Sequence, residues 1–359
     1  MLAPDGQTLA SGSKDGAIKL WSPDVFQERQ SVKDHLEGHS IEQIAFSRDG
    51  GTMFTISSNR SFGTWETATL QPLTPYELPR DVRIAVISPQ GNQVAAGLTN
   101  GAVQVWSVPN RGKAPQPGRN LLLAPPSVSE PPFAARIDED RSAAFLLVTW
   151  SADGQRLAAY MNSLHVWDAI TDQLVRKLPL GDKPYSIALS TNGRILAAGI
   201  DQNIELWDLT TGNKLPTCVG HREYTLELTF SPDGKTLASA NIDGTAALWE
   251  IPSGKRKFPL TSHQYAVIHL AFSPDGRTLA TRGADDMVKL WNVETGRELL
   301  TIELPQNSTD WGRYFGGVRF SPDGSLLAVG ILVPAPHIEF KRAPAVTEIE
   351  AAEAAKARN

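Results

Sequence analysis

The chain is poor in cysteine, in long hydrophobic runs and in charge of one sign. Its single cysteine, Cys218, excludes an internal disulfide and a metal site built from several cysteines. No hydrophobic run approaches the roughly 18 residues that a bilayer span requires, and the N-terminus lacks the basic-then-apolar pattern of a signal peptide. The formal charge of −5 argues against phosphate-backbone binding. We therefore expect no nucleic-acid partner, no membrane insertion and a cytoplasmic location.

Sequence motifs for catalysis are also missing. The chain has no G-x-S-x-G, Walker or dinucleotide-binding fingerprint. His35, Glu37 and His39 form a string that resembles a zinc motif, but such a motif needs a helix to bring both histidines to one face. The segment contains a glycine and is expected to form strand and turn. We therefore expect no catalytic residue, no metal and no cofactor.

The sequence does contain a repeat. A turn element ending in glycine recurs eight times, and five of the seven gaps between these glycines fall between 39 and 44 residues. A tryptophan follows the first seven glycines by 13 to 15 residues, and Phe340 follows the last by 16. Short β-rich runs separate these landmarks, so each unit is predicted to be four short strands joined by tight turns. A four-strand unit of this length is typical of a β-propeller blade.

Two of the units share a finer pattern of four polar or aromatic residues at gaps of 18, 4 and 6. The residues are His221, Ser239, Asp243 and Trp249 in one unit, and His263, Thr281, Asp285 and Trp291 in the other. In these residues and in the repeat spacing, residues 7 to about 341 resemble the WD-repeat β-propeller family. The resemblance implies that the eight residues form hydrogen-bond networks that stabilise their blades.

The ends of the repeat leave two possible blade counts. With seven blades, residues 27–36 supply the outer strand of the last blade, and residues 1–22 are a leftover partial repeat. With eight, the first blade lacks an inner strand and the last lacks an outer one. We favour seven, because closing the last blade leaves no exposed strand edge. The expected domains are thus 1–22, a propeller over 23–341, and a helical tail over 342–359.

Both counts imply that the chain is a fragment of a longer protein or begins at a late start codon. The C-terminal stretch resembles the terminal segment of long bacterial WD-repeat proteins. In that family such arrays often follow a serine/threonine kinase domain or another signalling module. The resemblance therefore implies a bacterial signalling or regulatory protein, with a kinase domain or a second propeller upstream.

Two insertions interrupt the repeat and are candidate binding segments. Residues 108–142 are rich in proline, and form either a tolerated loop or a docking segment. Residues 306–317 contain Trp311, Arg313 and Tyr314, which are residue types enriched at interface hot spots. The resemblance places this second insertion on the face where loops converge around the central channel, so we predict that these three residues contact a partner.

The function predicted from the sequence is a non-enzymatic scaffold that binds a protein or peptide partner. The alternative is a propeller enzyme or small-ligand sensor that uses the central channel. That alternative requires ionisable side chains from several first strands at one height. The predicted first strands are instead apolar, as in residues 44–46, 187–189 and 270–272.

Overall fold

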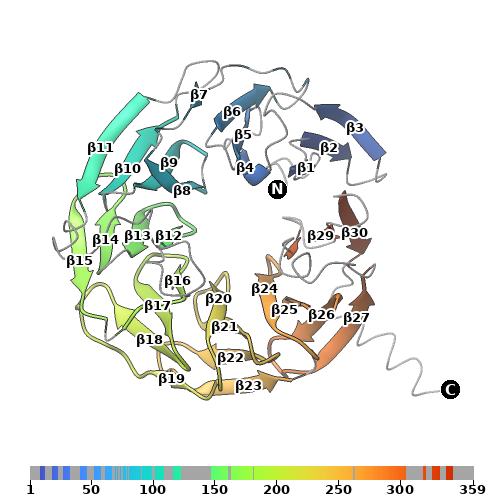
Figure 1. Cartoon of the computed structure of the whole chain (residues 1–359). Helices are drawn as coiled ribbons and strands as arrows, with labels where there is room; N and C mark the ends of the chain where they lie inside the picture. The colour runs from blue at the N-terminus through green and yellow to red at the C-terminus, as the bar shows by residue number, and fades with distance from the viewer. Residues whose placement is uncertain are drawn as a thin grey trace, which may run out of the picture.

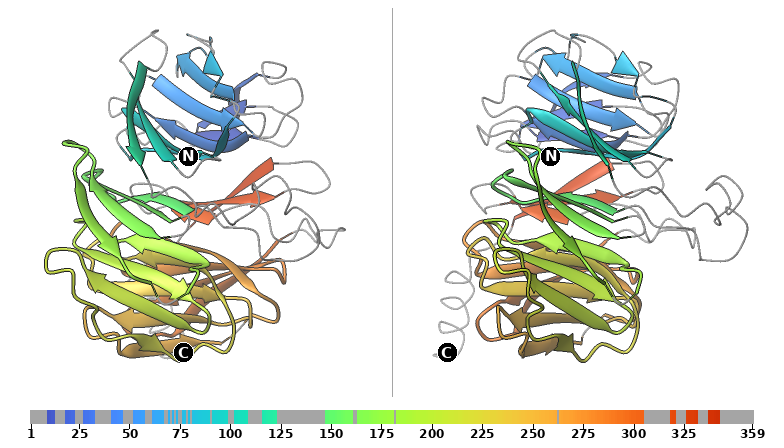
Figure 2. Two further views of the ribbon diagram at one scale, coloured as in Figure 1. Left: turned by 60° about the vertical axis from the view of Figure 1, so that its left-hand side comes forward. Right: turned by 90° about the vertical axis from the view of Figure 1, so that its left-hand side faces the viewer.

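The computed structural model describes residues 147–304 apart from 161, 162, 181 and 262. Elsewhere it describes the strands between residues 9 and 342 and a few turn residues between 69 and 108. The described strands form eight antiparallel sheets. These sheets stand side by side in a ring around a central opening (Figure 1), and the edge-on views show them arranged around one axis (Figure 2). The structure is therefore the all-β propeller that the repeat predicts.

Six of the described sheets have four strands, and in the first three of these the strands follow one another in sequence order. They consist of β4 (Ile41–Phe46), β5 (Thr52–Ser57), β6 (Ser61–Glu66) and β7 (Tyr76–Glu77); of β8 (Val82–Ile87), β9 (Gln93–Leu98), β10 (Ala102–Ser107) and β11 (Gln116–Leu122); and of β12 (Leu147–Trp150), β13 (Arg156–Tyr160), β14 (Leu164–Asp168) and β15 (Leu174–Leu178). The first strand of each sheet lies nearest the opening and the last lies on the rim (Figure 1).

Three more four-stranded sheets follow with the same order. They consist of β16 (Ser186–Leu189), β17 (Ile195–Ile200), β18 (Asn203–Asp208) and β19 (Cys218–Val219); of β20 (Thr225–Phe230), β21 (Thr236–Asn241), β22 (Ala246–Glu250) and β23 (Arg256–Leu260); and of β24 (Val267–Phe272), β25 (Thr278–Gly283), β26 (Met287–Asn292) and β27 (Glu298–Glu303). Both predicted hydrogen-bond networks lie in the last two of these sheets.

The two remaining sheets have three strands each, and they correct one sequence-based expectation. They consist of β1 (Leu9–Gly12), β2 (Ile18–Ser22) and β3 (Gln27–Val32), and of β28 (Val318–Phe320), β29 (Leu326–Ile331) and β30 (His337–Arg342). Because β3 pairs with β2 through a register that matches Ser22 to Gln27, it does not supply the outer strand of the last sheet. A short connection makes this local hairpin cheap in chain entropy. The described strands thus pair as the eight-blade alternative expects, with three strands in the first sheet and three in the last.

The repeated turn element closes the hairpin between the first and second strands of a sheet. In the turn after β20, the Ser231 hydroxyl donates to Asp233 at 2.6 Å and accepts from the Thr236 N–H at 3.0 Å. Asp233 also accepts from the Lys235 N–H at 3.0 Å. Gly234 completes the turn with a φ of 71°, a left-handed conformation that disfavours other residues. The Ser-Pro-Asp-Gly string is therefore a self-satisfied turn.

The hydrophobic core lies between neighbouring sheets, because each sheet is covered on both faces. Trp249 of β22 packs with Leu206 and Cys218 of the preceding sheet, and Trp291 of β26 packs with Leu248 and Leu260. Every third-strand tryptophan for which burial is described is at most 7% exposed. The ring is thus held together by apolar contacts between successive sheets, with the tryptophans among the largest buried groups.

Replacing Ser231 by alanine should lower the free energy of unfolding by about 1–2 kcal/mol. The change removes the acceptor of the Thr236 N–H in a turn where Ser231 is 2% exposed. Ser253→Ala, at an exposed turn serine, is the matched control and should cost less than about 0.5 kcal/mol. Urea unfolding of the three proteins measures the difference, and equal values for both variants would contradict the role given to Ser231.

Candidate functional site

The sheet β20–β23 contains the first hydrogen-bond network. The Ser239 hydroxyl on β21 lies 2.8 Å from Trp249 Nε1, whose N–H it accepts, and 2.6 Å from Nε2 of His221. The other ring nitrogen, Nδ1, lies 3.4 Å from the Thr245 hydroxyl, which in turn donates to Asp243 at 2.6 Å. Four of these residues are those singled out in the sequence, and Thr245 is an addition. Asp243 therefore reaches the histidine through a threonine.

The sheet β24–β27 contains the second network, with a direct carboxylate contact. Thr281 Oγ1 accepts from Trp291 Nε1 at 2.9 Å and lies 2.7 Å from His263 Nε2. His263 Nδ1 lies 3.0 Å from both carboxylate oxygens of Asp285. Burial alone would raise the pKa of Asp285, but hydrogen bonds from His263 and from two backbone N–H groups lower it. This network joins the loop before β24 to the turn between β25 and β26.

The two histidines are bound into the networks of their loops. Burial lowers the pKa of His221 to about 4, so the ring is neutral at neutral pH. Each His ring has both nitrogens engaged by side chains of its own sheet. The two aspartates of the networks fix the loop residues beside the histidines. Asp243 accepts from the Arg222 N–H at 3.3 Å, and Asp285 accepts from the Gln264 N–H at 3.0 Å. The networks therefore position the loops at one end of the ring.

Other sheets bury their tryptophan with different partners. In β18, Trp207 Nε1 donates to Glu205 at 3.2 Å, and Glu205 forms an ion pair of 2.5 Å with Lys214. In β14, the ring of His165 stacks on Trp167 with centroids 5.6 Å apart. Glu205 and His165 each stand two residues before the tryptophan of their strand. That spacing places them on the same face of the strand, which is the signal by which the sequence could have identified them.

The first strands are joined to one another by side chains that sequence analysis missed. Ser186 on β16 donates to the Thr225 carbonyl at 3.0 Å. Glu227 on β20 accepts from the Leu270 N–H at 2.8 Å and lies 3.3 Å from His269 Nδ1. These contacts connect β16, β20 and β24 near the axis. Glu227 and His269 are a pair of ionisable residues in strands that the sequence predicts to be apolar.

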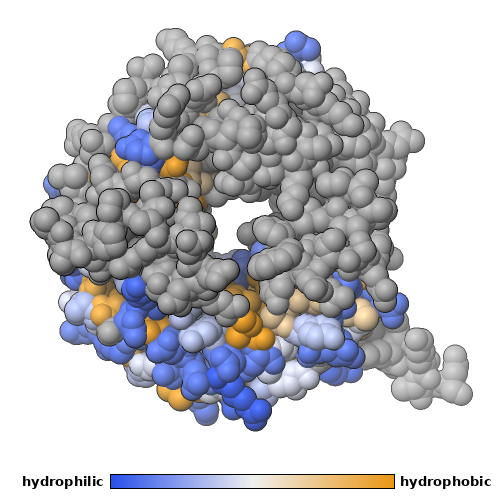
Figure 3. Space-filling view, in the orientation of Figure 1, coloured by the Kyte–Doolittle hydropathy of each residue, from blue (hydrophilic) through white to orange (hydrophobic). Residues whose placement is uncertain are grey.

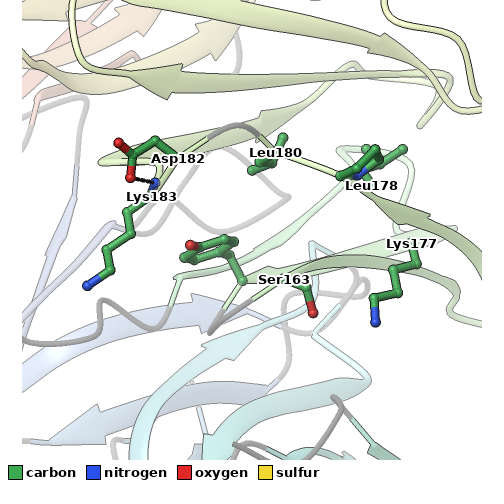
Figure 4. Close-up of a pocket in the computed structure, with 8 residues that line it drawn as sticks. Ser163, Lys177, Leu178, Leu180, Asp182 and Lys183 are labelled. Atoms are coloured by element: carbon green, nitrogen blue, oxygen red, sulfur yellow. Dashed lines mark hydrogen bonds between the residues drawn. The ribbon is translucent and has the colours of Figure 1, made fainter. Parts of the chain in front are cut away.

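A pocket of about 540 Å³ lies beside the start of β14 and the segment after β15. Its walls include Tyr160, Ser163 and Lys177, together with Asp182 and Lys183. Figure 4 shows the two lysine side chains at opposite sides of the pocket, with their ammonium groups far apart. Asp182 instead accepts from the Lys183 backbone N–H at 2.7 Å. The lysines do not converge on one point, so the pocket lacks the geometry of an anion site.

Tyrosines gather at the end of the ring where the first strands begin. We call this end the entry face, and define it by the segments before β16, β20 and β24 and by the turns β17–β18, β21–β22 and β25–β26. Tyr185 and Tyr224 stack there with centroids 4.3 Å apart. Tyr265, one sheet further on, is 56% exposed. Both networks also end on the entry face, which makes it the best-supported binding surface.

Several residues and segments singled out in the sequence lie outside the described part of the chain. Trp311, Arg313 and Tyr314, most of the insertion over 108–142, and the predicted helix lie outside the described residues. Within the described ranges, no three His, Cys, Asp or Glu side chains gather as a possible metal site. No helix in this described part is long and hydrophobic enough to cross a bilayer. Burial raises the pKa of the Cys218 thiol to about 12, which suppresses its reactivity.

Ser239→Ala should lower the free energy of unfolding by about 2–3 kcal/mol, because a buried indole N–H and an imidazole nitrogen both lose their partner. Trp249→Phe removes the N–H alone, and Trp249→Ala should cost about 3–5 kcal/mol. In the double variant Ser239→Ala, Trp249→Phe, the loss in free energy of unfolding should be about 1 kcal/mol smaller than the sum of the losses in the Ser239→Ala and Trp249→Phe single variants. Strictly additive losses in denaturant unfolding would show that the hydroxyl and the indole do not interact.

Acid should destabilise the sheet β20–β23 through His221. The pKa of this ring is about 4 in the fold against an ordinary value of 6.5, so only the unfolded chain takes up the proton between these values. The contribution is fully present above pH 6.5 and is lost as the pH falls towards 4. At about pH 5 the loss should be about 2 kcal/mol. Urea unfolding at neutral pH and at about pH 5 should show that loss in the wild type and not in His221→Gln.

A family model matches the chain in the two segments that contain the networks and in one N-terminal segment. The WD40 family model (WD domain, G-beta repeat) matches residues 2–22, 212–250 and 254–292. The second and third segments contain the two networks built on Trp249 and Trp291. In structure, the chain is similar to a crystal form of the computationally designed Ika8 protein, with a TM-score of 0.70, 21% identity and 93% of each chain covered. At that identity the likeness shows the fold alone.

Relatives in sequence include proteins of fungi and animals. The chain is 24% identical to Protein HIR1 of Candida albicans over an aligned length of 275, and the match covers 66% of this chain and 30% of that protein. It is 28% identical to a Periodic tryptophan protein 2 homolog of Neurospora crassa (53% and 21% covered) and 27% identical to Apoptotic protease-activating factor 1 of Danio rerio (66% and 17% covered). It therefore spans less than a third of the length of each. Three segments of the chain match the WD40 repeat, and its ring of antiparallel sheets has the fold of a β-propeller.

Proposed function

We propose that this chain is a non-catalytic scaffold that binds a protein or peptide partner through the loops of the entry face. The observation that carries the proposal is a group of half-buried and exposed tyrosines at that face, where the hydrogen-bond networks hold the nearby loop residues Arg222 and Gln264. Tyrosine is enriched at protein interfaces because a large, stiff ring contributes contact area at a small entropic cost. A rigid ring that presents such rings on short loops suits recognition better than chemistry.

Hydrophobic residues support the same surface. Ala266, Ile268 and Ala284 form a small buried cluster at the entry face, with Leu226 and Ile242 partly buried against it. Figure 3 shows hydrophobic surface at the rim of the central opening, over the region where Figure 1 places β20. The residues of this cluster are buried, so they hold the loops of the entry face from beneath rather than form its exposed surface.

The loop before β28 is proposed to extend this surface. Trp311, Arg313 and Tyr314 precede β28 in the sequence as Tyr185 precedes β16 and Tyr224 precedes β20. The first strands described before β16, β20 and β24 start at the entry face, and we propose that the segment before β28 faces the same end. We propose these three residues as partner contacts on the strength of their position and type.

The setting proposed for the scaffold is a longer signalling or regulatory polypeptide in the cytoplasm, with a kinase domain or a second propeller upstream. The support is that the chain covers 17–30% of the relatives named above, so these proteins carry much more than the matched part. Those relatives come from fungi and a fish, and they lend no support to the bacterial assignment made from the sequence.

The alternative function, an enzyme or small-ligand sensor in the central channel, has one observation in its favour. Glu227 and His269 bring an acid and an imidazole together on neighbouring first strands. However, Glu227 already accepts from the backbone N–H of Leu270, as a link between sheets would. A catalytic channel needs more converging groups than this pair, and the scaffold accounts better for both residues.

Affinity capture from native lysate tests the scaffold. Wild-type protein should retain a partner that the variant Trp311→Ala, Arg313→Ala loses, because two contact residues are removed. Ile170→Ala is the matched control, since Ile170 is 76% exposed in the turn between β14 and β15, at the opposite end of the ring. Retention by the control and loss by the double variant would support the proposal. An identical set of captured proteins in all three would contradict the contact residues, and no captured protein would contradict the scaffold.

A further inference from the structure

Two aromatic rings from different sheets meet on the entry face. Tyr185 precedes β16 and Tyr224 precedes β20, and their ring planes are inclined by 29° at a centroid distance of 4.3 Å. Both side chains are half-buried, so part of each ring faces solvent. The electron-rich faces of tyrosine rings attract cations. The stack is therefore a surface to which a flat cationic group can bind.

The backbone around Tyr185 is fixed before any ligand binds. The Tyr185 N–H donates to the Gly199 carbonyl at 2.8 Å, and the next residue, Ser186, donates from its hydroxyl to the Thr225 carbonyl at 3.0 Å. A Cβ on Gly199 would lie 2.9 Å from Thr225 Cβ, so the glycine permits this close approach of the two sheets. The approach of β16 to β20 brings the residues before them, Tyr185 and Tyr224, side by side.

The backbone around Tyr224 is held equally well. The Tyr224 carbonyl accepts from the Ile242 N–H at 3.2 Å, and the carbonyl of Glu223 accepts from the buried Asn241 amide at 2.6 Å. The stack is thus attached at both ends to the strands of two sheets. Fixing the rings in advance reduces the entropy lost when a partner binds.

Carboxylates surround the stack. Asp182 lies three residues before Tyr185, and Asp201 occupies the turn between β17 and β18 on the same face; both are exposed. Burial, the hydrogen bond to Tyr224 and the charges of Tyr224, Asp201 and Asp182 raise the pKa of Tyr185, which keeps its ring neutral. In the two loops Asp182 and Glu223 balance Lys183 and Arg222, and Asp201 in the turn between β17 and β18 adds a further negative charge. The local field therefore favours a cation.

We propose that the Tyr185–Tyr224 stack, with Asp182 and Asp201 beside it, binds an arginine side chain of the protein partner. A guanidinium group is planar, stacks on aromatic faces and donates in a fork to carboxylates. Lysine offers a point charge without that shape, and a neutral or acidic residue gains nothing from the two carboxylates. The inference deepens the proposed scaffold function, on which it rests, by naming the chemistry that one part of the entry face recognises.

Isothermal titration calorimetry with three short Gly/Ala peptides tests this site on the intact chain. The peptides carry arginine, lysine or citrulline at their centre, and citrulline keeps the shape of arginine without its charge. At low salt the arginine peptide should bind best, and citrulline should weaken binding at least about fivefold, the range of one cation–π or charge-assisted contact. Added salt should weaken the arginine complex and leave any citrulline complex nearly unchanged.

Variants of the site sharpen the test. Asp182→Asn, Asp201→Asn should weaken the arginine complex at least about fivefold, and asparagine suits the left-handed backbone of Asp201, whose φ is 47°. Tyr185→Leu, Tyr224→Leu removes the aromatic faces and should weaken it to a similar extent. The control is Asp172→Asn, since Asp172 shares the left-handed conformation, with a φ of 58°, but lies at the opposite end of the ring. It should bind as the wild type does.

Three results would overturn the arginine site. They are equal binding of arginine and citrulline peptides, an equal loss in the Asp172 control, and no binding up to about 1 mM peptide, the weakest affinity expected of a single side-chain site. The first would leave a peptide-binding face and hence the scaffold intact. The lysate capture, which uses different residues, tests the scaffold itself. If the tyrosine variant fails to fold, the asparagine variant still decides the question.

Discussion

The structure depends on the burial of a tryptophan in the third strand of a sheet together with a partner for its N–H. Trp249 is completely buried, yet its indole N–H donates to Ser239, whose hydroxyl also meets a histidine from the adjoining loop. An unpaired N–H at this depth would cancel much of the gain from burying the ring. One hydroxyl therefore joins the apolar packing between sheets to the placement of the loops.

This coupling explains why the entry face can serve recognition. The residues before β20 and β24 are bonded to the turn between the second and third strands of their sheet, through Asp243 in one sheet and Asp285 in the next. Side chains such as Ser186 and Glu227 then link one first strand to its neighbour. Loops that are fixed in this way present tyrosines and carboxylates in a set geometry, so a partner loses less entropy on binding them.

Spacing in the sequence predicted much of this, because the repeat imposes its own geometry. The Ser-Pro-Asp-Gly strings predict the first hairpin of a sheet, and the 18, 4 and 6 residue gaps predict the networks at Trp249 and Trp291. The position of β3 escaped prediction, since pairing with β2 or with the last sheet satisfies the same hydrophobic pattern. The Tyr185–Tyr224 stack and the Glu227–His269 pair escaped as well, because they join residues about 40 positions apart in different sheets.

Amide hydrogen exchange of the free chain tests most directly whether the networks hold the entry face in place. The account predicts that the N–H groups of Tyr185, Arg222 and Gln264 are protected together with β21 and β25, because each donates to a group fixed by a sheet. Exchange of these three amides as fast as in an unfolded peptide, while β21 and β25 stay protected, would contradict it. That result would mean that the sheets are stable but do not position the binding loops.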